Sequence, residues 1–578
     1  MRRLLALSLS SLALMAALSG AVRAEDAAKP AVTGPEADAG AWLAARAASA
    51  AGDFRAGAFW YERALKDDPA NQQLLDGAVL SAIGLGDFPA AAAYARRLGQ
   101  TGARSQTAFL ALTAEQAAKG EFGQLVKDID SGRSIGSVLD KLIIAWAQLG
   151  DGKMTDALKA FDELAKTDGL SGLALYHKAL AMASAGDFEG AEAIFSGKAA
   201  GPIEVTRRGV IAHVEILSQL EQGPKALEIL DNTFGTDPDP ELDALRAVLK
   251  SGKPLPFDVV RTAQDGMAEV FRSLAEVLGD QADPGFLLLY TRVAAYLRPD
   301  LTDAVLTAAQ ILERQGQLDL AAETFAKVPP QDPLFHIAEM GRADTLIAQG
   351  KVDAGIEVLQ ALTRSHADLP AVQIALADAL RVQERFADSI PAYDKAISMV
   401  GTPQPRHWAL FFARGISHER VGDFPAAEKD LRESLKLSPD QPSVLNYLGY
   451  SFVDRGENLE EALDMIQRAV KAQPESGAIT DSLAWAYFRL GRYQDAVAPM
   501  ERASLLEPVD PIVTDHLGDV YWAVGRKLEA RFQWHRALSF GPEEKEATRI
   551  RKKLEVGLDQ VLIDEGKPPI TPVVADGN

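Results

Sequence analysis

The sequence predicts an all-α protein, a right-handed superhelical solenoid built from stacked helix–turn–helix repeats. The first observation behind this prediction is a repeat. Asp481 to Pro508 reads DSLAWAYFRLGRYQDAVAPMERASLLEP, and Asp515 to Pro542, 34 residues later, has leucine, tyrosine, glycine and alanine at matching positions. The second observation is the regular recurrence of residues that end helices. A glycine, an acidic residue and phenylalanine recur between helices, and proline often follows the second helix of a pair.

The first 37 residues are expected to lie outside this fold. Residues 1–24 carry two arginines, a short apolar run and small residues before Glu25, which is typical of a secretory signal peptide cleaved after Ala24. The apolar run is shorter than the ~20 residues that span a bilayer, and no later segment is apolar enough, so no transmembrane anchor is expected. Residues 25–37 are rich in proline and alanine and predict a flexible leader.

The remaining chain divides into two predicted arms and a cap. Residues 38–249 form a partly degenerate N-terminal arm, and residues 302–544 form a C-terminal arm with clearer repeats. Between them, residues 250–301 are expected to be an irregular helical junction, because SGKPLPFDVV interrupts the period. Residues 545–564 predict a capping helix that covers the last repeat, and residues 565–578 predict a loose tail.

Composition limits the class of function. A chain of 578 residues with 47% hydrophobic and 24% charged side chains is globular but too long for one compact core. Its formal net charge of -21 argues against nucleic acid as a partner, since a phosphate backbone requires clustered lysine and arginine. The chain has no cysteine, which excludes disulfides, thiolate metal sites and a lipid anchor on an N-terminal cysteine.

Small and large side chains alternate within each predicted helix pair. In one pair Leu448, Gly449 and Phe452 are followed by Ala462 and Ile466 at the spacing that lets one helix lie close to the other. This pattern, with its 34-residue period, resembles the tetratricopeptide repeat (TPR) family, and roughly thirteen units fit between residues 38 and 542. The resemblance implies a protein-binding scaffold whose first helices line a concave groove.

A stripe of polar and aromatic side chains on the first helices is the candidate partner-binding site. Asp481, Trp485 and Phe488 are spaced i, i+4 and i+7, away from the predicted core face. With the equivalent positions of neighbouring repeats, the predicted groove comprises Phe412, Asn446, Tyr450, Asp481, Trp485, Phe488, Asp515, Asp519 and Trp522. A partner segment with apolar side chains and some positive charge suits this stripe, whereas a terminal carboxylate would be repelled. The alternative is that neighbouring repeats bury these residues.

No pattern typical of catalysis occurs in the sequence. There is no zinc-protease, phosphate-loop or nucleophile-elbow motif, and the eight histidines are scattered. His516 and His535 fall in one repeat without a third ligand, which is too few for a metal site. We therefore predict no enzyme activity, no cofactor and no metal. If the chain were an enzyme or ligand-binding protein, its site would be expected near residues 250–300, where the repeat pattern fails.

The sequence thus predicts a periplasmic scaffold or adaptor that binds one or more proteins or peptides. The C-terminal run from Leu445 to Val497 also resembles, more loosely, envelope TPR proteins of Gram-negative bacteria, some of which deliver substrates to carboxy-terminal processing proteases. Some of those proteins are lipoproteins, and this chain lacks the cysteine that lipidation needs. The resemblance implies a protease adaptor, and the alternative is a structural component of an envelope assembly or export machine.

Overall fold

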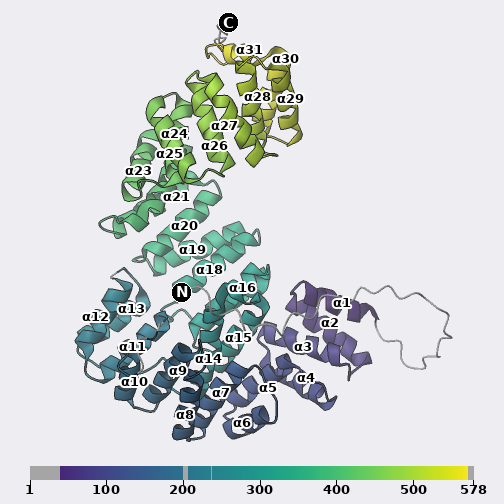
Figure 1. Ribbon diagram of the computed structural model, residues 1–578, viewed down its shortest axis with the longest axis vertical. Helices are drawn as coiled ribbons and strands as arrows, with labels where there is room; N and C mark the ends of the chain where they lie inside the picture. Colours follow the sequence, from purple (N-terminus) through teal and green to yellow (C-terminus); the bar gives the residue numbers. More distant parts are fainter. Residues whose placement is uncertain (1–38, 200–202, 204–205, 236, 571–578) are drawn as a thin grey trace, which may run out of the picture. The chain divides into compact units, whose positions relative to one another are not determined.

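The computed structural model describes residues 39–199, 203, 206–235 and 237–570 (Figure 1). Within these ranges the chain consists of helices and connecting turns without any strand, which confirms the predicted all-helical repeat fold. The predicted signal peptide (1–24), the leader (25–37) and residues 571–578 of the predicted tail lie outside the described residues.

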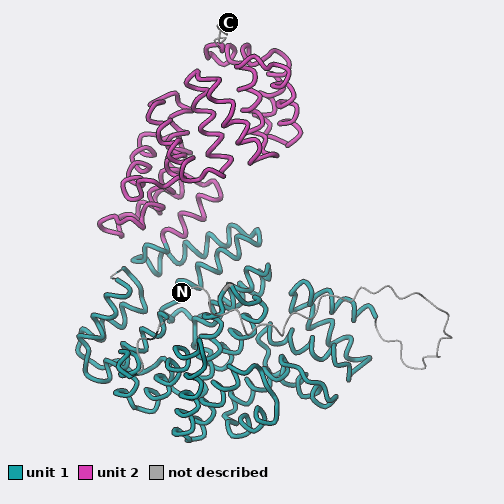
Figure 2. The backbone as a smooth tube through the Cα atoms, in the orientation of Figure 1, with its two compact units in different colours: residues 1–372 teal, residues 373–578 magenta. Residues whose placement is uncertain are grey.

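The chain forms two compact units, residues 1–372 and 373–578 (Figure 2). The first contains α1(Ala39–Ala50), α2(Phe54–Asp67), α3(Gln72–Leu85), α4(Phe88–Gln100), α5(Gln106–Ala118), α6(Phe122–Asp130), α7(Ser137–Gly150), α8(Met154–Ala165), α9(Ser171–Ser184), α10(Phe188–Phe195), α11(Arg207–Gln219), α12(Gly223–Phe234), α13(Pro240–Lys250), α14(Ala263–Leu278), η1(Gly279–Gln281), α15(Pro284–Leu297), α16(Thr302–Arg314), α17(Leu318–Phe325), α18(Phe335–Ala348) and α19(Val352–Ser365).

Helix α20(Pro370–Val382) begins at the end of the first unit. The second unit continues with α21(Phe386–Met399), η2(Pro405–His407), α22(Trp408–Arg420), α23(Phe424–Leu437), α24(Pro442–Arg455), α25(Leu459–Ala472), α26(Gly477–Arg489), α27(Tyr493–Leu506), α28(Pro511–Ala523), α29(Lys527–Ser539), α30(Glu544–Val556) and α31(Leu558–Asp564).

The recurrent glycine–acidic–phenylalanine turns have the predicted geometry. Gly86 has φ +80° and a left-handed conformation that ends α3, a conformation that side chains with a Cβ rarely adopt. Asp87 then accepts a hydrogen bond from the backbone N–H of Ala90 at 3.0 Å and caps α4. Asp53, Asp187 and Asp423 cap α2, α10 and α23 in the same way.

Close packing explains the small residues within each pair. A Cβ on Gly449 of α24 would lie 2.7 Å from Cγ1 of Ile466 on α25, so only glycine permits this approach of the two helices.

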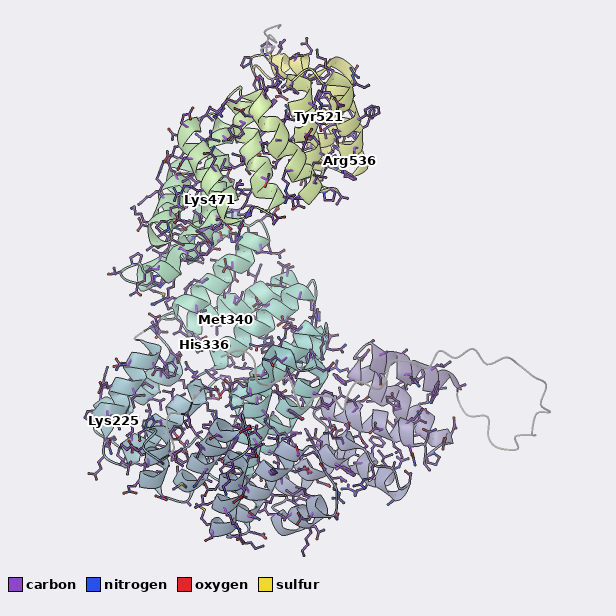
Figure 3. The ribbon with its side chains drawn as sticks, in the orientation of Figure 1. Lys225, His336, Met340, Lys471, Tyr521 and Arg536 are labelled. Carbon is purple, nitrogen blue, oxygen red and sulfur yellow. The ribbon has the colours of Figure 1, made fainter. Side chains whose placement is uncertain are left out.

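Ion pairs also join consecutive repeats. Lys225 of α12 donates to Glu192 of α10 at 2.9 Å, and Lys225 is labelled in Figure 3.

The predicted junction at residues 250–301 is not a boundary between the units. Residues 263–297 form the hairpin α14–α15, which packs against the first helices α3, α5, α7 and α9 of the first unit. Tyr296 of this hairpin stacks on Phe88 at 4.3 Å between ring centroids, and Arg292 Nε donates to the carbonyl oxygen of Gly84 at 3.0 Å. The segment thus covers earlier repeats, and α15 also packs against the next helix, α16.

The predicted capping helix is present as two helices, α30 and α31. Gly557 separates them with φ +85°, and a Cβ at this position would lie 2.7 Å from the Trp522 ring. Ile550 and Leu558 are buried, and Leu554 packs partly buried beside them. The two helices shield the last repeat, α28–α29, where Tyr521 and Arg536 are labelled in Figure 3.

Candidate partner-binding groove

The predicted groove residues lie on the first helices of four consecutive repeats in the second unit. We call the surface that these helices form the first-helix face. Helix α22 carries Phe412, α24 carries Asn446 and Tyr450, α26 carries Asp481, Trp485 and Phe488, and α28 carries Asp515, Asp519 and Trp522. The structure covers the residues of α26 and α28, leaves Asn446 and Tyr450 on an open pocket that Asp481 also reaches, and packs Phe412 behind the pocket wall.

The α28 end of the stripe is covered by the capping helices. Lys553 of α30 is fully buried, and its Nζ lies 2.7–2.8 Å from the carboxylate oxygens of Asp515 and 2.7 Å from those of Asp519. Trp522 is 9% exposed and donates through Nε1 to Asp559 of α31 at 2.9 Å. The expectation that these three α28 residues line an open groove is therefore corrected, because the chain's own cap occupies their polar and aromatic surface.

The α26 part of the stripe is closed by the next repeat. His516 of α28 places Nδ1 3.0 and 3.1 Å from the two carboxylate oxygens of Asp481. The Trp485 ring lies between His516 and Phe488, with centroid distances of 4.0 and 4.7 Å. Burial lowers the pKa of His516, but the carboxylates of Asp481, Asp515 and Asp519 together outweigh burial and raise this pKa above its ordinary value, with Asp481 the largest of the three.

His516 is a structural partner that the sequence pattern did not identify. Its contact with Asp481 joins residues 35 positions apart on adjacent first helices. The 34-residue period could have pointed to this pair, because it places a histidine and an aspartate at nearly equivalent positions of neighbouring repeats. Within the described part of the chain, no group of three or more side chains has the arrangement of a metal site.

Between α22 and α28 the first-helix face remains open as a pocket of about 620 Å³, which we call the groove pocket. Asn446, Tyr450 and Asp481 line it, which brings three of the predicted residues together. The side-chain oxygen of Asn446 is buried without a hydrogen-bond partner among the described residues, and buried polar atoms of this kind normally have one. Burial, with the nearby Asp481 charge, raises the pKa of Tyr450 to about 12, so its hydroxyl stays protonated.

The rim of the groove pocket carries charges of both signs and exposed apolar surface. Glu419, Asp454 and Asp510 supply negative charge, and Arg420 and Arg455 supply positive charge. Both cations are already engaged, since the Arg455 guanidinium stacks on Phe424 at 4.2 Å and the Arg420 guanidinium stacks on Phe386 at 4.7 Å. Ile512 is 51% exposed beside the acidic groups. The pocket can accept hydrogen bonds, bury apolar side chains and attract a cation.

Phe412 does not line the groove pocket. Its ring packs partly buried against Trp408 and Tyr447, with centroid distances of 6.1 and 5.7 Å. The Tyr447 hydroxyl donates to Glu419 at 3.0 Å, so Phe412 supports a side chain of the pocket wall from behind.

The stacked helix pairs and the lined groove define a repeat-solenoid scaffold for protein interactions. A tetratricopeptide repeat family model matches residues 144–202, 340–406, 412–477, 448–505 and 482–545. The chain contains tetratricopeptide repeats, and repeats of this family bind protein or peptide partners. In the part of the chain that the structure describes, every helix is too short or too polar to cross a membrane.

Similar proteins share these repeats over part of their length. A TPR repeat-containing protein of Pseudomonas aeruginosa is 30% identical over 191 residues, 32% of this chain and 31% of that protein. Human tetratricopeptide repeat protein 13 is 28% identical over 196 residues, 32% of this chain and 22% of that protein. The chain thus matches less than a third of either relative's length. A chain of the APC/C hetero-tetramer Cut9–Hcn1 is 16% identical, with a TM-score of 0.38 and coverage of 90% of this chain and 96% of that chain.

Proposed function

We propose that the protein is an exported adaptor whose groove pocket holds a segment of a partner protein with apolar side chains and positive charge. One observation supports this proposal most directly. The groove pocket joins the partnerless acceptor of Asn446 to the rim carboxylates, while the equivalent surface two repeats later, at Asp515 and Asp519, is filled by the protein's own Lys553. The cap therefore provides an example of the type of segment that such a surface can bind, a lysine on an apolar helix face.

The first unit is a less suitable place for such a partner. Its first helices α3, α5, α7 and α9 are already packed against α14 and α15. A partner that used this face would have to displace a helix in which Met267, Val270 and Phe271 are completely buried. The groove pocket of the second unit requires no such displacement.

Export and the identity of the partner complete the proposal. The basic start, the apolar run and the small residues before Glu25 support cleavage after Ala24 and a periplasmic location. N-terminal sequencing of the mature protein should begin at or near Glu25, and an intact Met1 on protein in the cytoplasm would refute export. The looser resemblance to envelope adaptors supports a processing protease and its substrates as the partners.

Site-specific photocrosslinking in intact cells tests the proposed function. A photoreactive phenylalanine at Tyr450 of the groove pocket should crosslink to a partner, whereas the same residue at Asp464 on α25, whose side chain is 70% exposed, should not. Recovery of a protease and its substrates supports the adaptor. Recovery of integral envelope proteins instead supports an assembly component, and equal or absent crosslinking at the two positions contradicts a role for the groove pocket.

A further inference from the structure

A second cavity, of about 350 Å³, lies inside the first unit and is independent of the groove pocket. It forms where α14 and α15 face α11, α13 and α16, so it exists only because the hairpin folds back onto the repeats. Four arginines line it: Arg207, Arg208, Arg272 and Arg314. Three carboxylates line it as well, in a chain whose acidic residues otherwise outnumber its basic ones, 81 to 60.

Two of these arginines are fixed from behind by Glu269, which is 1% exposed. Arg272 donates to Glu269 through Nε at 3.0 Å and Nη2 at 2.8 Å, and Arg208 donates to it through Nε at 2.8 Å. Tyr176 adds a hydrogen bond at 2.9 Å. Burial alone would raise the pKa of Glu269, but the two guanidinium groups hold it at about 2, so the anchor stays ionised.

Both guanidinium groups line the cavity. Each nitrogen of Arg272 already makes one hydrogen bond, with Nη1 donating to Glu276, whereas Nη1 of Arg208 lies beside Asp303. A guanidinium has five N–H donors in a planar fork, a geometry that suits carboxylates. Nη2 of Arg208 also donates to the carbonyl oxygen of Val259 at 2.9 Å, which fixes the orientation of the group. The cavity therefore contains a rigid pair of cations in place before any ligand arrives.

The three carboxylates supply the opposite charge on the remaining walls. Glu241 accepts from Arg207 at 2.7 Å, and Glu276 accepts from Arg272 at 2.6 Å. Asp303 is different, because its Oδ2 lies 3.9 Å from Nη1 of Arg208, beyond hydrogen-bonding distance. Arg208 and Asp303 thus line the cavity side by side without a hydrogen bond between them.

The other walls are apolar. Ile211 of α11, Leu287 of α15 and Ile311 of α16 line the cavity between the charged groups. Its volume lies within the roughly 300–1,000 Å³ usual for small-molecule sites, which combine apolar walls with a few fixed polar groups. Asp303 and Glu276 would repel a purely anionic ligand, and the arginines would repel a purely cationic ligand. A ligand with both charges can place each charge against a group of opposite sign.

We propose that this cavity binds a small zwitterion with an aliphatic side chain, either a free α-amino acid or a short peptide. The ligand carboxylate lies against Arg208 and Arg272, its ammonium group lies against Asp303, and its side chain contacts Ile211, Leu287 and Ile311. This inference does not depend on the groove pocket, and each can fail alone.

Calorimetric titration of the full chain tests the proposal with four probes that share one side chain. L-leucine carries both charges, L-leucinamide lacks the carboxylate, N-acetyl-L-leucine lacks the ammonium group, and leucyl-leucine is the short peptide. We expect L-leucine, leucyl-leucine or both to bind at least tenfold more tightly than either singly charged analogue. The zwitterion that binds more tightly shows whether the ligand is a free amino acid or a short peptide. Absence of binding by both zwitterions, or equal binding by a singly charged analogue, overturns the proposal.

Two variants test whether the zwitterion binds in this cavity. Asp303→Asn removes the ammonium partner and should weaken zwitterion binding at least tenfold, and Thr307→Phe should block the cavity by volume. Asp156→Asn, at an exposed position of α8, is the matched control and should bind as the wild type does. Circular dichroism checks that each variant is folded. Unchanged binding in both cavity variants overturns the assignment.

Discussion

Lys553 of α30 places its ammonium nitrogen 2.7 Å from both carboxylate oxygens of Asp519 on α28, and neither side chain is more than 1% exposed. Asp515 accepts from the same nitrogen. Burial raises the pKa of Asp515 and the Lys553 charge opposes that rise, so removal of the lysine would leave two carboxylates buried together. This contact joins the cap to the last repeat.

Lys553→Met should therefore destabilise the end of the second unit by about 3–5 kcal/mol, the usual cost of removing one partner from a buried ion pair. Hydrogen exchange of α28 to α31 measures the effect locally. Lys552→Met is the matched control, since the Lys552 side chain is 47% exposed and pairs at the surface with Asp564. Similar protection in the two variants would contradict a structural role for the buried pair.

Trp522→Ala should destabilise the same region by roughly 3–5 kcal/mol, because the ring is buried and its Nε1 is hydrogen-bonded. This effect on folding differs from the expectation that Trp522 lines an open groove. Urea denaturation measures the free energy of unfolding. The control Phe532→Ala, at a side chain that is 64% exposed on α29, should change it by less than about 0.5 kcal/mol. A Trp522 variant as stable as this control would restore the open-groove interpretation.

The stability of the second unit should fall as pH rises, through His516. Because the Asp481 carboxylate raises the folded-state pKa of His516, the charged histidine stabilises the fold below its unfolded pKa of about 6.5. That contribution is lost as pH rises through the folded value. Thermal melting from pH 6 to pH 9 measures it, and His516→Gln should flatten the curve. Asp481→Asn should weaken the dependence, since it removes the largest of the interactions that raise the pKa of His516, and an unchanged curve would exclude this pair.

A buried carboxyl gives the first unit its own pH dependence. Glu215 of α11 accepts hydrogen bonds from the backbone N–H groups of Asp258 and Val259 through the same oxygen, at 2.9 and 3.1 Å. Burial raises its pKa to about 7, and these hydrogen bonds oppose the rise only in part. A proton on the other oxygen leaves both bonds intact, so the protonated form holds the 255–261 segment without the cost of a buried charge.

The first unit should therefore become less stable as pH rises from about 4.5 to about 7, by up to about 3 kcal/mol, and level off above that range. Glu215→Gln keeps an acceptor for both N–H groups and should abolish the dependence. Hydrogen exchange of residues 253–261 at pH 5 and pH 8 distinguishes this effect from that of His516. Equal exchange in wild type and variant at both pH values would show that Glu215 does not titrate in this range.

Periodicity predicted the helix pairs, their turns and the cap, because each depends on residues close in sequence. It did not predict the place of α14, since that packing joins residues such as Gly266 and Trp146, which are 120 positions apart. It also left open whether the stripe on the first helices lines a groove or is buried by neighbouring repeats. Phe488 and Trp522 are 8% and 9% exposed, because a neighbouring first helix or the cap covers the stripe that a single repeat leaves open.

The affinity of a charged apolar peptide for the groove pocket tests the central claim most directly. A fluorescent nonapeptide of leucines and lysines should bind the full chain at least tenfold more tightly than the same peptide with glutamates, and more so at low salt. Tyr450→Ala with Asp454→Lys should weaken this binding at least tenfold, since about 1.4 kcal/mol is a factor of ten and a buried aromatic contact contributes about 2 kcal/mol. Asp464→Lys on α25 should leave it unchanged. Equal affinity for the two peptides, or for the two variants, would contradict the groove pocket as the binding site.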